Sequence, residues 1–321
     1  MSFKKITIAG GGVLGSQIAF QSAYCGFDVT IWLYKEEVLQ NTLDKLASIK
    51  TVYIDAINNM ASNNSSDVVW YSGIAKPDNF NKEKCLKNVE KASKSVKIEF
   101  DLKKALENAD LLIESLPEIK SDKADFYKKI KPIVDKNTVI ASNASTFVPS
   151  DFAALTGNED KFLALHFANP ICKNNMAEIM AQPKVDFKYF DEVVEYAEQI
   201  NMIALPARKE KAGYILNSML VPLILSGLDL YANEIAEPEI IDKTYKLATG
   251  APKGPFEIFD AIGIKTAYDV VEQYQKVPGI VSPLLKKMMF PYNFKKMKEI
   301  LKKLIDEGKL GVTTGEGFYK Y

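Results

Sequence analysis

Short apolar runs and helix-spaced apolar positions alternate from the first residues of the chain. Residues 6–9 form an apolar run that predicts a buried strand, and three glycines at positions 10–12 interrupt it. Apolar positions at helical spacing follow over residues 13–24, and residues 29–33 form a second apolar run. This order predicts a strand, a glycine turn, a helix and a second strand.

A long excursion then separates this opening unit from the next strand signals. Residues 36–60 and 82–94 predict helices, and residues 61–80, rich in Asn, Ser and Asp, predict a loop. The excursion therefore spans about residues 36–96. It is too long for a simple crossover between two strands, so we expect it to project from the sheet as a helical insertion.

Strand and helix signals alternate again beyond the excursion. Apolar runs at residues 111–114, 138–142 and 163–167 are typical of buried parallel strands, and residues 121–134 and 189–200 predict helices. Such alternation predicts the α/β class, with a doubly wound (Rossmann) dinucleotide-binding domain.

The last third of the chain carries a different pattern. From residue 214 to residue 303 we find helical periodicity only, interrupted by glycines and prolines. We place the domain boundary near residue 207. The prediction is a Rossmann domain over residues 1–206, followed by an all-helical domain over residues 207–321 for substrate binding and dimerisation.

Composition excludes several classes of function. The 321 residues include 41 Lys and Arg against 41 Asp and Glu, so no overall charge attracts a nucleic acid or a membrane surface. The most apolar stretch, residues 213–231, contains Asn217, Pro222 and Asp229, which argues against a membrane span. No signal-peptide pattern opens the chain, and we expect a cytoplasmic protein.

Cysteine and histidine usage argues against metal and disulfide chemistry. Cys25, Cys85 and Cys172 are odd in number and show no Cys-x-x-Cys spacing. His166 is the single histidine, so a multi-histidine metal site is impossible, and we expect no metal.

The glycine turn fits the dinucleotide fingerprint G-x-G-x-x-G, with glycines at positions 10, 12 and 15 and with Val13 and Leu14 between them. Gly10 allows the tight turn, Gly12 lets the backbone approach a pyrophosphate, and Gly15 lets the helix pack on the strand. The helix N-terminus supplies free N–H groups to the anion. The acidic residue that usually ends the second strand is missing, because Leu33 stands there.

Later segments resemble the 3-hydroxyacyl-CoA dehydrogenase family, and 3-hydroxybutyryl-CoA dehydrogenases within it, over residues 5–321. Six ordered segments carry the resemblance: Glu-Ser-Leu-Pro-Glu at 114–118, Ser-Asn-Ala-Ser-Thr at 142–146, Leu-His-Phe-Ala-Asn-Pro at 165–170, Gly-Tyr-Ile-Leu-Asn at 213–217, Gly-Pro-Phe-Glu at 254–257 and Gly-Glu-Gly-Phe-Tyr at 315–319. The fourth of these resembles the Gly-Phe-x-x-Asn segment of the family. The resemblance implies reversible oxidation of a short L-3-hydroxyacyl-CoA, with the four-carbon substrate favoured.

The resemblance also implies roles for individual residues. His166 matches the catalytic histidine, and Glu178 has the family's spacing of 178 − 166 = 12 residues to its paired glutamate. Ser145 matches the serine that hydrogen-bonds the substrate oxygen, and Asn217 the asparagine that orients the reacting group. Glu118 matches an acid beside the nicotinamide. Asn143, in the 142–146 segment, joins the expected cofactor-binding residues.

Acid–base chemistry is consistent with these roles. Oxidation of a secondary alcohol needs a base for the hydroxyl proton, and imidazole titrates near neutral pH. A carboxylate on its other nitrogen stabilises the imidazolium. Taken alone, His166 would be a structural histidine at a strand end, Ser145 a loop residue and Asn217 a buried amide. The His–Glu spacing and the Asn-Pro that follows favour the catalytic interpretation.

Three departures from the family pattern bear on specificity. With Leu33 in place of an acid, NAD is the expected cofactor and NADP stays possible. Lys35 lies two residues further on and could contact the 2′-phosphate of NADP. Ala144 replaces the usual Thr beside the substrate. Residues 173–175, Lys-Asn-Asn, occupy a region that is usually more apolar, so the acyl pocket is open to change.

Two further surfaces follow from the resemblance. Four lysines of the excursion share roughly one helix face: Lys84, Lys87, Lys91 and Lys94. Lys87 and Lys91 could hold CoA phosphates, and a solvated basic face is the equal alternative. The apolar run at residues 215–230 predicts a homodimer through the helical domain.

Two other functions stay open at this point. One is the oxidation of a hydroxy acid or polyol acid outside CoA chemistry by the same His–Glu pair. The other is a cofactor-binding structural protein of the crystallin type. Ser145, His166, Glu178 and Asn217 together argue against the second, since a structural role needs none of them.

Overall fold

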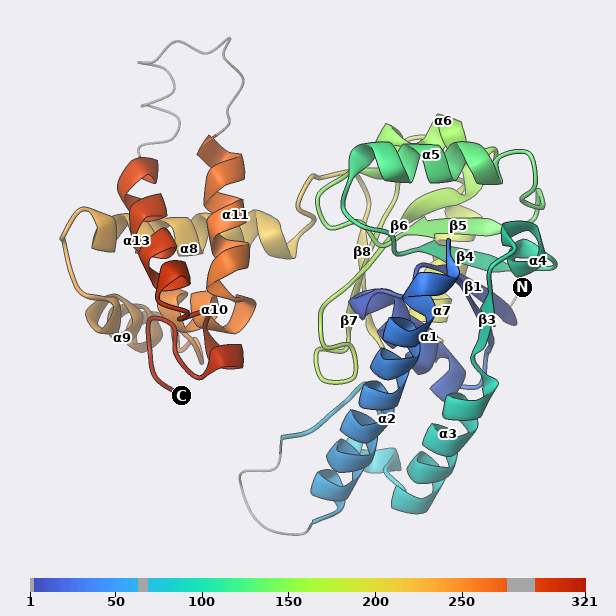
Figure 1. The fold of residues 1–321 in the computed structure, drawn as a ribbon, viewed down its shortest axis with the longest axis horizontal. Coiled ribbons are helices and arrows are strands. Elements are labelled where there is room, and N and C mark those ends of the chain that lie inside the picture. The colour runs from blue at the N-terminus through green and yellow to red at the C-terminus, as the bar shows by residue number, and fades with distance from the viewer. Residues whose placement is uncertain (1–2, 63–68, 276–291) are drawn as a thin grey trace. The chain divides into compact units, whose positions relative to one another are not determined.

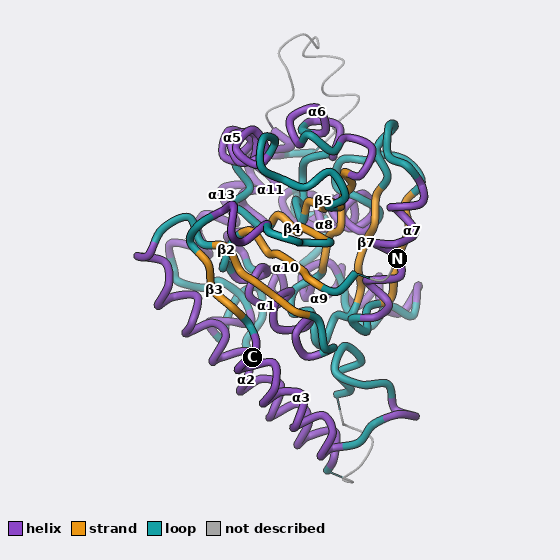
Figure 2. Tube along the Cα trace, turned by 90° about the vertical axis from the view of Figure 1, so that its right-hand side faces the viewer, coloured by secondary structure: helices purple, strands orange, loops and turns teal. Residues whose placement is uncertain are grey.

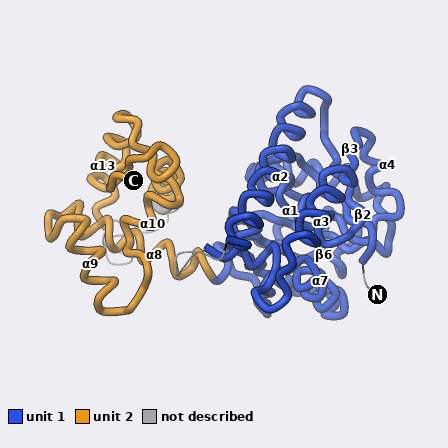
Figure 3. Tube along the Cα trace, turned by 90° about the horizontal axis from the view of Figure 1, so that it is seen from below, with its two compact units in different colours: residues 1–215 blue, residues 216–321 orange. Residues whose placement is uncertain are grey.

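The computed structural model describes residues 3–62, 69–275 and 292–321, and the chain divides into two compact units, Met1–Ile215 and Leu216–Tyr321 (Figure 3). The predicted loop at 61–80 and the predicted helical region up to residue 303 extend in part into residues outside this description.

The described residues of the first unit form eight strands: β1 (Lys5–Ala9), β2 (Asp28–Trp32), β3 (Lys97–Glu99), β4 (Leu111–Glu114), β5 (Val139–Ser142), β6 (Phe162–Phe167), β7 (Met176–Met180) and β8 (Ile203–Ala207). Its helices are α1 (Val13–Tyr24), α2 (Leu39–Ala61), α3 (Lys82–Ser95), α4 (Leu102–Leu106), α5 (Lys120–Ile130), α6 (Ala153–Thr156) and α7 (Phe187–Gln199). The second unit contains α8 (Leu216–Ala232), α9 (Pro238–Thr249), α10 (Pro255–Ile262), α11 (Ile264–Gln275) and α13 (Phe294–Asp306).

One sheet runs through the first unit in the order β3-β2-β1-β4-β5-β6-β7-β8. The pairs from β3 to β6 are parallel, as predicted, whereas β7 runs antiparallel to β6. The expected Rossmann architecture is confirmed. Three strands, β3, β7 and β8, have no counterpart among the predicted elements.

Helices cover both faces of this sheet (Figure 1). Alternate residues of β4 show the two layers: Leu111 and Ile113 pack in the cluster that contains α1 and α7, and Leu112 packs in the cluster that contains α5. Such alternation follows from the two-residue period of a strand. The excursion forms a long hairpin in which α2 and α3 lie side by side, as Figures 1 and 2 both show.

The boundary between the units lies later than the sequence placed it. We expected a boundary near residue 207, where β8 in fact ends. The chain then stays with the first unit to Ile215, because the backbone N–H of Ile215 donates to Glu178 Oε1 at 2.9 Å. The segment from the end of β8 to Ile215 therefore belongs to the first unit.

The second unit is helical, as predicted, and has its own apolar core around Leu225, Leu228, Phe256, Phe259 and Met297. Its C-terminal segment is tied to α10, since the buried carboxylate of Asp260 accepts from the backbone N–H groups of Phe318 and Tyr319. Among the described residues, no helix combines the length and the apolar character that a membrane crossing requires.

Candidate functional site

A cleft of about 430 Å³ lies where the glycine turn meets the carboxyl ends of β1, β4 and β5. The backbone of Gly10 is in the left-handed region with φ 113°. A Cβ at Gly15 would lie 2.0 Å from the Gly10 carbonyl oxygen, whereas a Cβ at Gly12 would meet open space. Gly12 is the N-cap of α1, so this turn offers helix N–H groups where a backbone can approach a pyrophosphate. The cleft fits the cofactor that the sequence predicts.

Five further residues predicted to bind the cofactor also line this cleft: Val13, Leu14, Leu33, Glu118 and Asn143. Ser145, predicted as a catalytic residue, lines it as well. Leu33 is 1% exposed and brings no carboxylate to the cleft. Sequence reasoning missed the wall that α2 supplies, which includes Asn41, Thr42 and Lys45. The helical spacing of residues 41 and 45 is the one signal that could have shown two of them on one face.

A buried ion pair supports the opposite wall of the cleft. The Nζ of Lys123 lies 2.7 Å from Glu114 Oε1, and the two side chains are 1% and 0% exposed. The other Glu114 oxygen accepts hydrogen bonds from Tyr127 and Ser142. Removal of one partner would leave an uncompensated buried charge and would therefore destabilise this wall.

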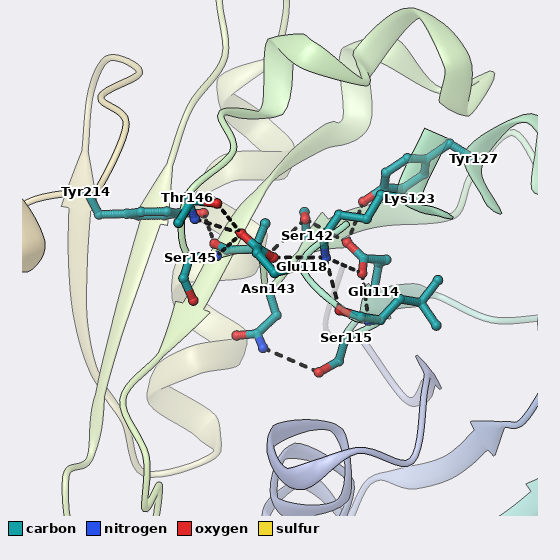
Figure 4. Close-up of polar contacts among 12 residues, drawn as sticks. Glu114, Ser115, Glu118, Lys123, Tyr127, Ser142, Asn143, Ser145, Thr146 and Tyr214 are labelled. Carbon is teal, nitrogen blue, oxygen red and sulfur yellow. Dashed lines mark hydrogen bonds and ion pairs between the residues drawn. The ribbon is translucent and has the colours of Figure 1, made fainter. Parts of the chain in front are cut away.

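Glu118 connects this ion pair to the turn that carries Ser145 (Figure 4). Its Oε1 accepts from the backbone N–H groups of Ser145 at 3.0 Å and Thr146 at 2.8 Å, and its Oε2 lies 3.3 Å from Lys123 Nζ. Burial alone would raise the pKa of Glu118, but the Thr146 hydrogen bonds and the Lys123 ammonium hold that pKa below its usual value. Glu118 is therefore an ionised support of the Ser145 turn, in addition to its place in the cleft.

His166 and Glu178 are brought together by the β6–β7 pairing. They are directly opposite partners in the antiparallel register, and His166 Nδ1 lies 3.2 Å from Glu178 Oε2. Both side chains are buried. The twelve-residue spacing in the sequence is thus the length of one strand return. Because Nδ1 faces the carboxylate, Nε2 is the nitrogen that can exchange a proton with a substrate.

Tyr214 is a site residue that sequence reasoning missed. Its ring stacks on the His166 ring with 4.7 Å between centroids, and its hydroxyl donates to the Ala144 carbonyl oxygen at 2.6 Å. The strand β6 and the turn that contains Ala144 thereby both contact the Tyr214 side chain. In the sequence, Tyr214 stands out only as part of the 213–217 motif. The pattern of apolar positions cannot predict its contacts with His166 and Ala144.

The remaining predicted residues lie elsewhere. Asn217 is on α8 in the second unit, so its approach to His166 stays a prediction. Lys87 and Lys91 are exposed on α3. In the ranges that the structure describes, no group of three His, Cys, Asp or Glu side chains could hold a metal ion.

The arrangement can perform acid–base chemistry next to a dinucleotide cleft. Ser145 lines the cleft, and Asn143 of the same turn accepts a hydrogen bond at Oδ1 from the backbone N–H of Phe167, the residue after His166. The strand that carries the His166 imidazole and the cleft wall are therefore linked through one turn. This combination suits transfer of a proton and a hydride to and from one carbon–oxygen group.

Comparison with known protein families matches nearly the whole chain. Residues 5–210 match the model described as 3-hydroxyacyl-CoA dehydrogenase, NAD binding domain, and residues 213–321 match the 3-hydroxyacyl-CoA dehydrogenase C-terminal domain.

Individual relatives extend over the same length. The chain is 28% identical to the mitochondrial hydroxyacyl-coenzyme A dehydrogenase of Homo sapiens, with 99% of this chain and 91% of the relative covered. It is 26% identical to the 3-hydroxybutyryl-CoA dehydrogenase of Clostridioides difficile, with 99% of each covered. A solved diketoreductase, described for substrate-directed dual catalysis of dicarbonyl compounds, is 38% identical with a TM-score of 0.83 and 100% of both chains covered.

Proposed function

Because the chain belongs to the 3-hydroxyacyl-CoA dehydrogenase family, an oxidoreductase family with an NAD-binding domain, we propose that it interconverts short L-3-hydroxyacyl-CoA and 3-oxoacyl-CoA. The substrate pair is the four-carbon one, 3-hydroxybutyryl-CoA and acetoacetyl-CoA. The observation that carries the proposal is the buried His166–Glu178 pair, linked through the 143–146 turn to the cofactor cleft.

Each residue has a defined part in the proposed reaction. NAD supplies the hydride acceptor when it is bound. His166 takes the hydroxyl proton at Nε2, and Glu178 stabilises the imidazolium that forms. The Ser145 hydroxyl donates to the substrate oxygen, and Asn217 has the orienting role that the family resemblance implies. In the reverse direction His166 donates the proton.

A second candidate substrate is a dicarbonyl compound without CoA. The diketoreductase is more similar to this chain, at 38% identity, than the two CoA dehydrogenases named above, at 28% and 26%. The same acid–base pair would serve, because a free ketone and a 3-oxoacyl thioester need the same proton. The oxidation of a non-CoA hydroxy acid or polyol acid, which the sequence left open, is not favoured by these relatives.

One assay separates the two candidates. NADH consumption is followed with acetoacetyl-CoA and with ethyl acetoacetate, a CoA-free dicarbonyl ester that carries the same acetoacetyl group. We expect the thioester to have the higher kcat/KM and free CoA to inhibit competitively. Preference for the ester, with no inhibition by CoA, would replace the first candidate by the second.

The cofactor end of the cleft supports weak discrimination between NADH and NADPH. Buried Leu33 cannot bind the ribose hydroxyls or repel a 2′-phosphate. Two cations lie near that end: Lys45 lines the cleft, and Lys35 Nζ lies 5.2 Å from the ring centroid of Tyr34, which also lines it. We propose that the enzyme uses NADH and accepts NADPH with a modest penalty.

Lys87 and Lys91 are proposed to bind the CoA phosphates. Both are exposed on α3, one turn apart, so two ammonium groups face the solvent together. Exposed lysines attract a phosphate as point charges, and added salt weakens this attraction.

A homodimer through the second unit is proposed as well. Large apolar side chains are exposed there, among them Leu247 at 78% and Ile240 at 55%. Ile240 and Leu230 also line an apolar groove of about 410 Å³. Such a patch favours a second copy as its partner. We expect sedimentation to show a dimer at micromolar concentration and Leu247→Glu to yield monomers; a wild-type monomer would contradict this.

The cytoplasmic location stays a prediction.

A further inference from the structure

Tyr214 contacts both halves of the candidate catalytic site, and the proposed reaction gives it no part. Its side chain is 1% exposed. The ring stacks on the His166 imidazole with 4.7 Å between centroids and 32° between planes, and the hydroxyl donates to the Ala144 carbonyl oxygen at 2.6 Å. In Figure 4 the phenol extends from the segment after β8 toward the turn that holds Ser145 and Thr146.

The backbone around Tyr214 is held in a conformation that side chains rarely adopt. Gly213 and Tyr214 have φ of 78° and 54°, both in the left-handed region. Such a conformation persists only when neighbouring contacts fix it. Here the Tyr214 N–H donates to the Lys211 carbonyl at 2.9 Å, and the next N–H, that of Ile215, donates to Glu178 Oε1 at 2.9 Å. The same short segment thus fixes the carboxylate of Glu178 and the ring beside His166.

The hydroxyl of Tyr214 acts on the other side of the site. Ala144 directly precedes Ser145, and both belong to the turn that Glu118 holds from the cleft side. The hydrogen bond from Tyr214 holds the turn from the side of His166. Burial raises the pKa of Tyr214, and the nearby carboxylates of Glu118 and Glu178 raise it further, so the phenol keeps the proton that it donates.

We propose that Tyr214 is a positioning residue that sets the separation between the His166 imidazole and the Ser145 hydroxyl. The inference rests on the proposed function, in which one substrate oxygen must reach both groups. A phenylalanine, which the family motif has at this position, would keep the stacked ring and lose the bond to Ala144. The Tyr214 hydroxyl is therefore a feature that distinguishes this chain from the family motif. It affects catalysis through the position of Ser145.

A double-mutant cycle tests this route. Tyr214→Phe should lower kcat roughly three- to tenfold, the range for one lost hydrogen bond, with the KM for NADH unchanged. In a Ser145→Ala background the same change should have almost no further effect on kcat, because the group it positions is gone. Tyr196→Phe is the matched control: Tyr196 is 0% exposed and its hydroxyl bonds Ser22 Oγ at 2.7 Å, and we expect kcat to stay at the wild-type value.

A second readout does not depend on turnover. His166 is the only histidine, so its imidazole C–H signals in an NMR spectrum are unambiguous. The Tyr214 ring should shift them upfield in the wild type and in Tyr214→Phe, and Tyr214→Leu should remove the shift.

Three results would overturn the assignment: a wild-type kcat in Tyr214→Phe, an undiminished effect of that change in the Ser145→Ala background, or an unshifted His166 signal in the wild type. The failure of the proposed function looks different. It would appear as full activity in His166→Gln, whatever the outcome at Tyr214.

Discussion

His166 and Glu178 face each other across the antiparallel strands β6 and β7, with 3.2 Å between Nδ1 and Oε2. Glu178 is 1% exposed, and its other oxygen accepts from the Ile215 N–H at 2.9 Å. The carboxylate is thus fixed at both oxygens. A fixed charge beside an imidazole stabilises the imidazolium without any rearrangement during the reaction.

This pairing predicts the effect of Glu178→Gln. The amide keeps the shape and loses the charge, so kcat should fall at least about tenfold while the KM for NADH stays near the wild-type value. Steady-state kinetics with both substrates varied provide the measurement. If only the free energy of unfolding changes and kcat does not, Glu178 is a structural residue.

The cofactor cleft predicts the effect of Leu33→Asp. An aspartate at this place would bind the ribose hydroxyls and repel a 2′-phosphate, so the ratio of kcat/KM for NADH to that for NADPH should rise. Calorimetric titration with NADP⁺ should show the same loss of binding. Lys35→Ala and Lys45→Ala should be compared as single variants. The one that removes the lysine near the 2′-phosphate should weaken the binding of NADPH and leave the binding of NADH unchanged. A wild-type enzyme that already rejects NADPH more than about a thousandfold, roughly 4 kcal/mol, would contradict the interpretation of Leu33.

The lysine face of α3 predicts the effect of a double charge reversal. Lys87→Glu with Lys91→Glu should raise the KM for the acyl-CoA at low salt, and the difference from the wild type should shrink as salt is added. The matched control is the reversal of Lys103 and Lys104, two exposed lysines on α4. An equal rise of KM in the control, or none in the α3 variant, would favour a solvated basic surface.

Glu118 predicts a dependence of stability on pH. Its pKa is lowered in the folded state by the Thr146 hydrogen bonds and the Lys123 ammonium, which outweigh burial. Its stabilising contribution is therefore present above the unfolded-state pKa of about 4.3 and is lost as pH falls through the folded-state pKa. Glu118→Gln should lower the free energy of unfolding at pH 7 and lower it less at pH 3.5. Urea titrations at both pH values measure the difference; an equal loss at both would show that Glu118 is not the group that titrates.

Local patterns predicted the fold where each element carries its own signal. The glycine turn, β1 and β2 follow from apolar runs and from glycines that a tight turn requires. By contrast, β7 carries a charged Glu178 at its centre, and β8 contains Pro206, so neither shows a plain apolar run. Their place in the sheet depends on pairing with β6, which no local pattern contains.

The site divides in the same way. His166 and Glu178 could be predicted from their spacing, because one strand return joins them. The burial of Lys123 could not be predicted, because a helix rich in lysines is expected to be exposed to solvent. In the structure the Lys123 side chain is 1% exposed and lies beside Glu114. Tyr214 could not either, because its contacts with Ala144 and His166 join segments far apart in the chain.

The most direct test of the account is the initial rate of NADH consumption with acetoacetyl-CoA in the wild type and in His166→Gln. If His166 Nε2 exchanges the proton, kcat should fall roughly 10²- to 10⁴-fold in the variant. The Kd for NADH, measured by fluorescence titration, should stay near the wild-type value, because His166 is not among the described residues that line the cofactor cleft. A kcat near that of the wild type, with the variant folded and binding NADH, would contradict the assignment of His166 as the acid and base.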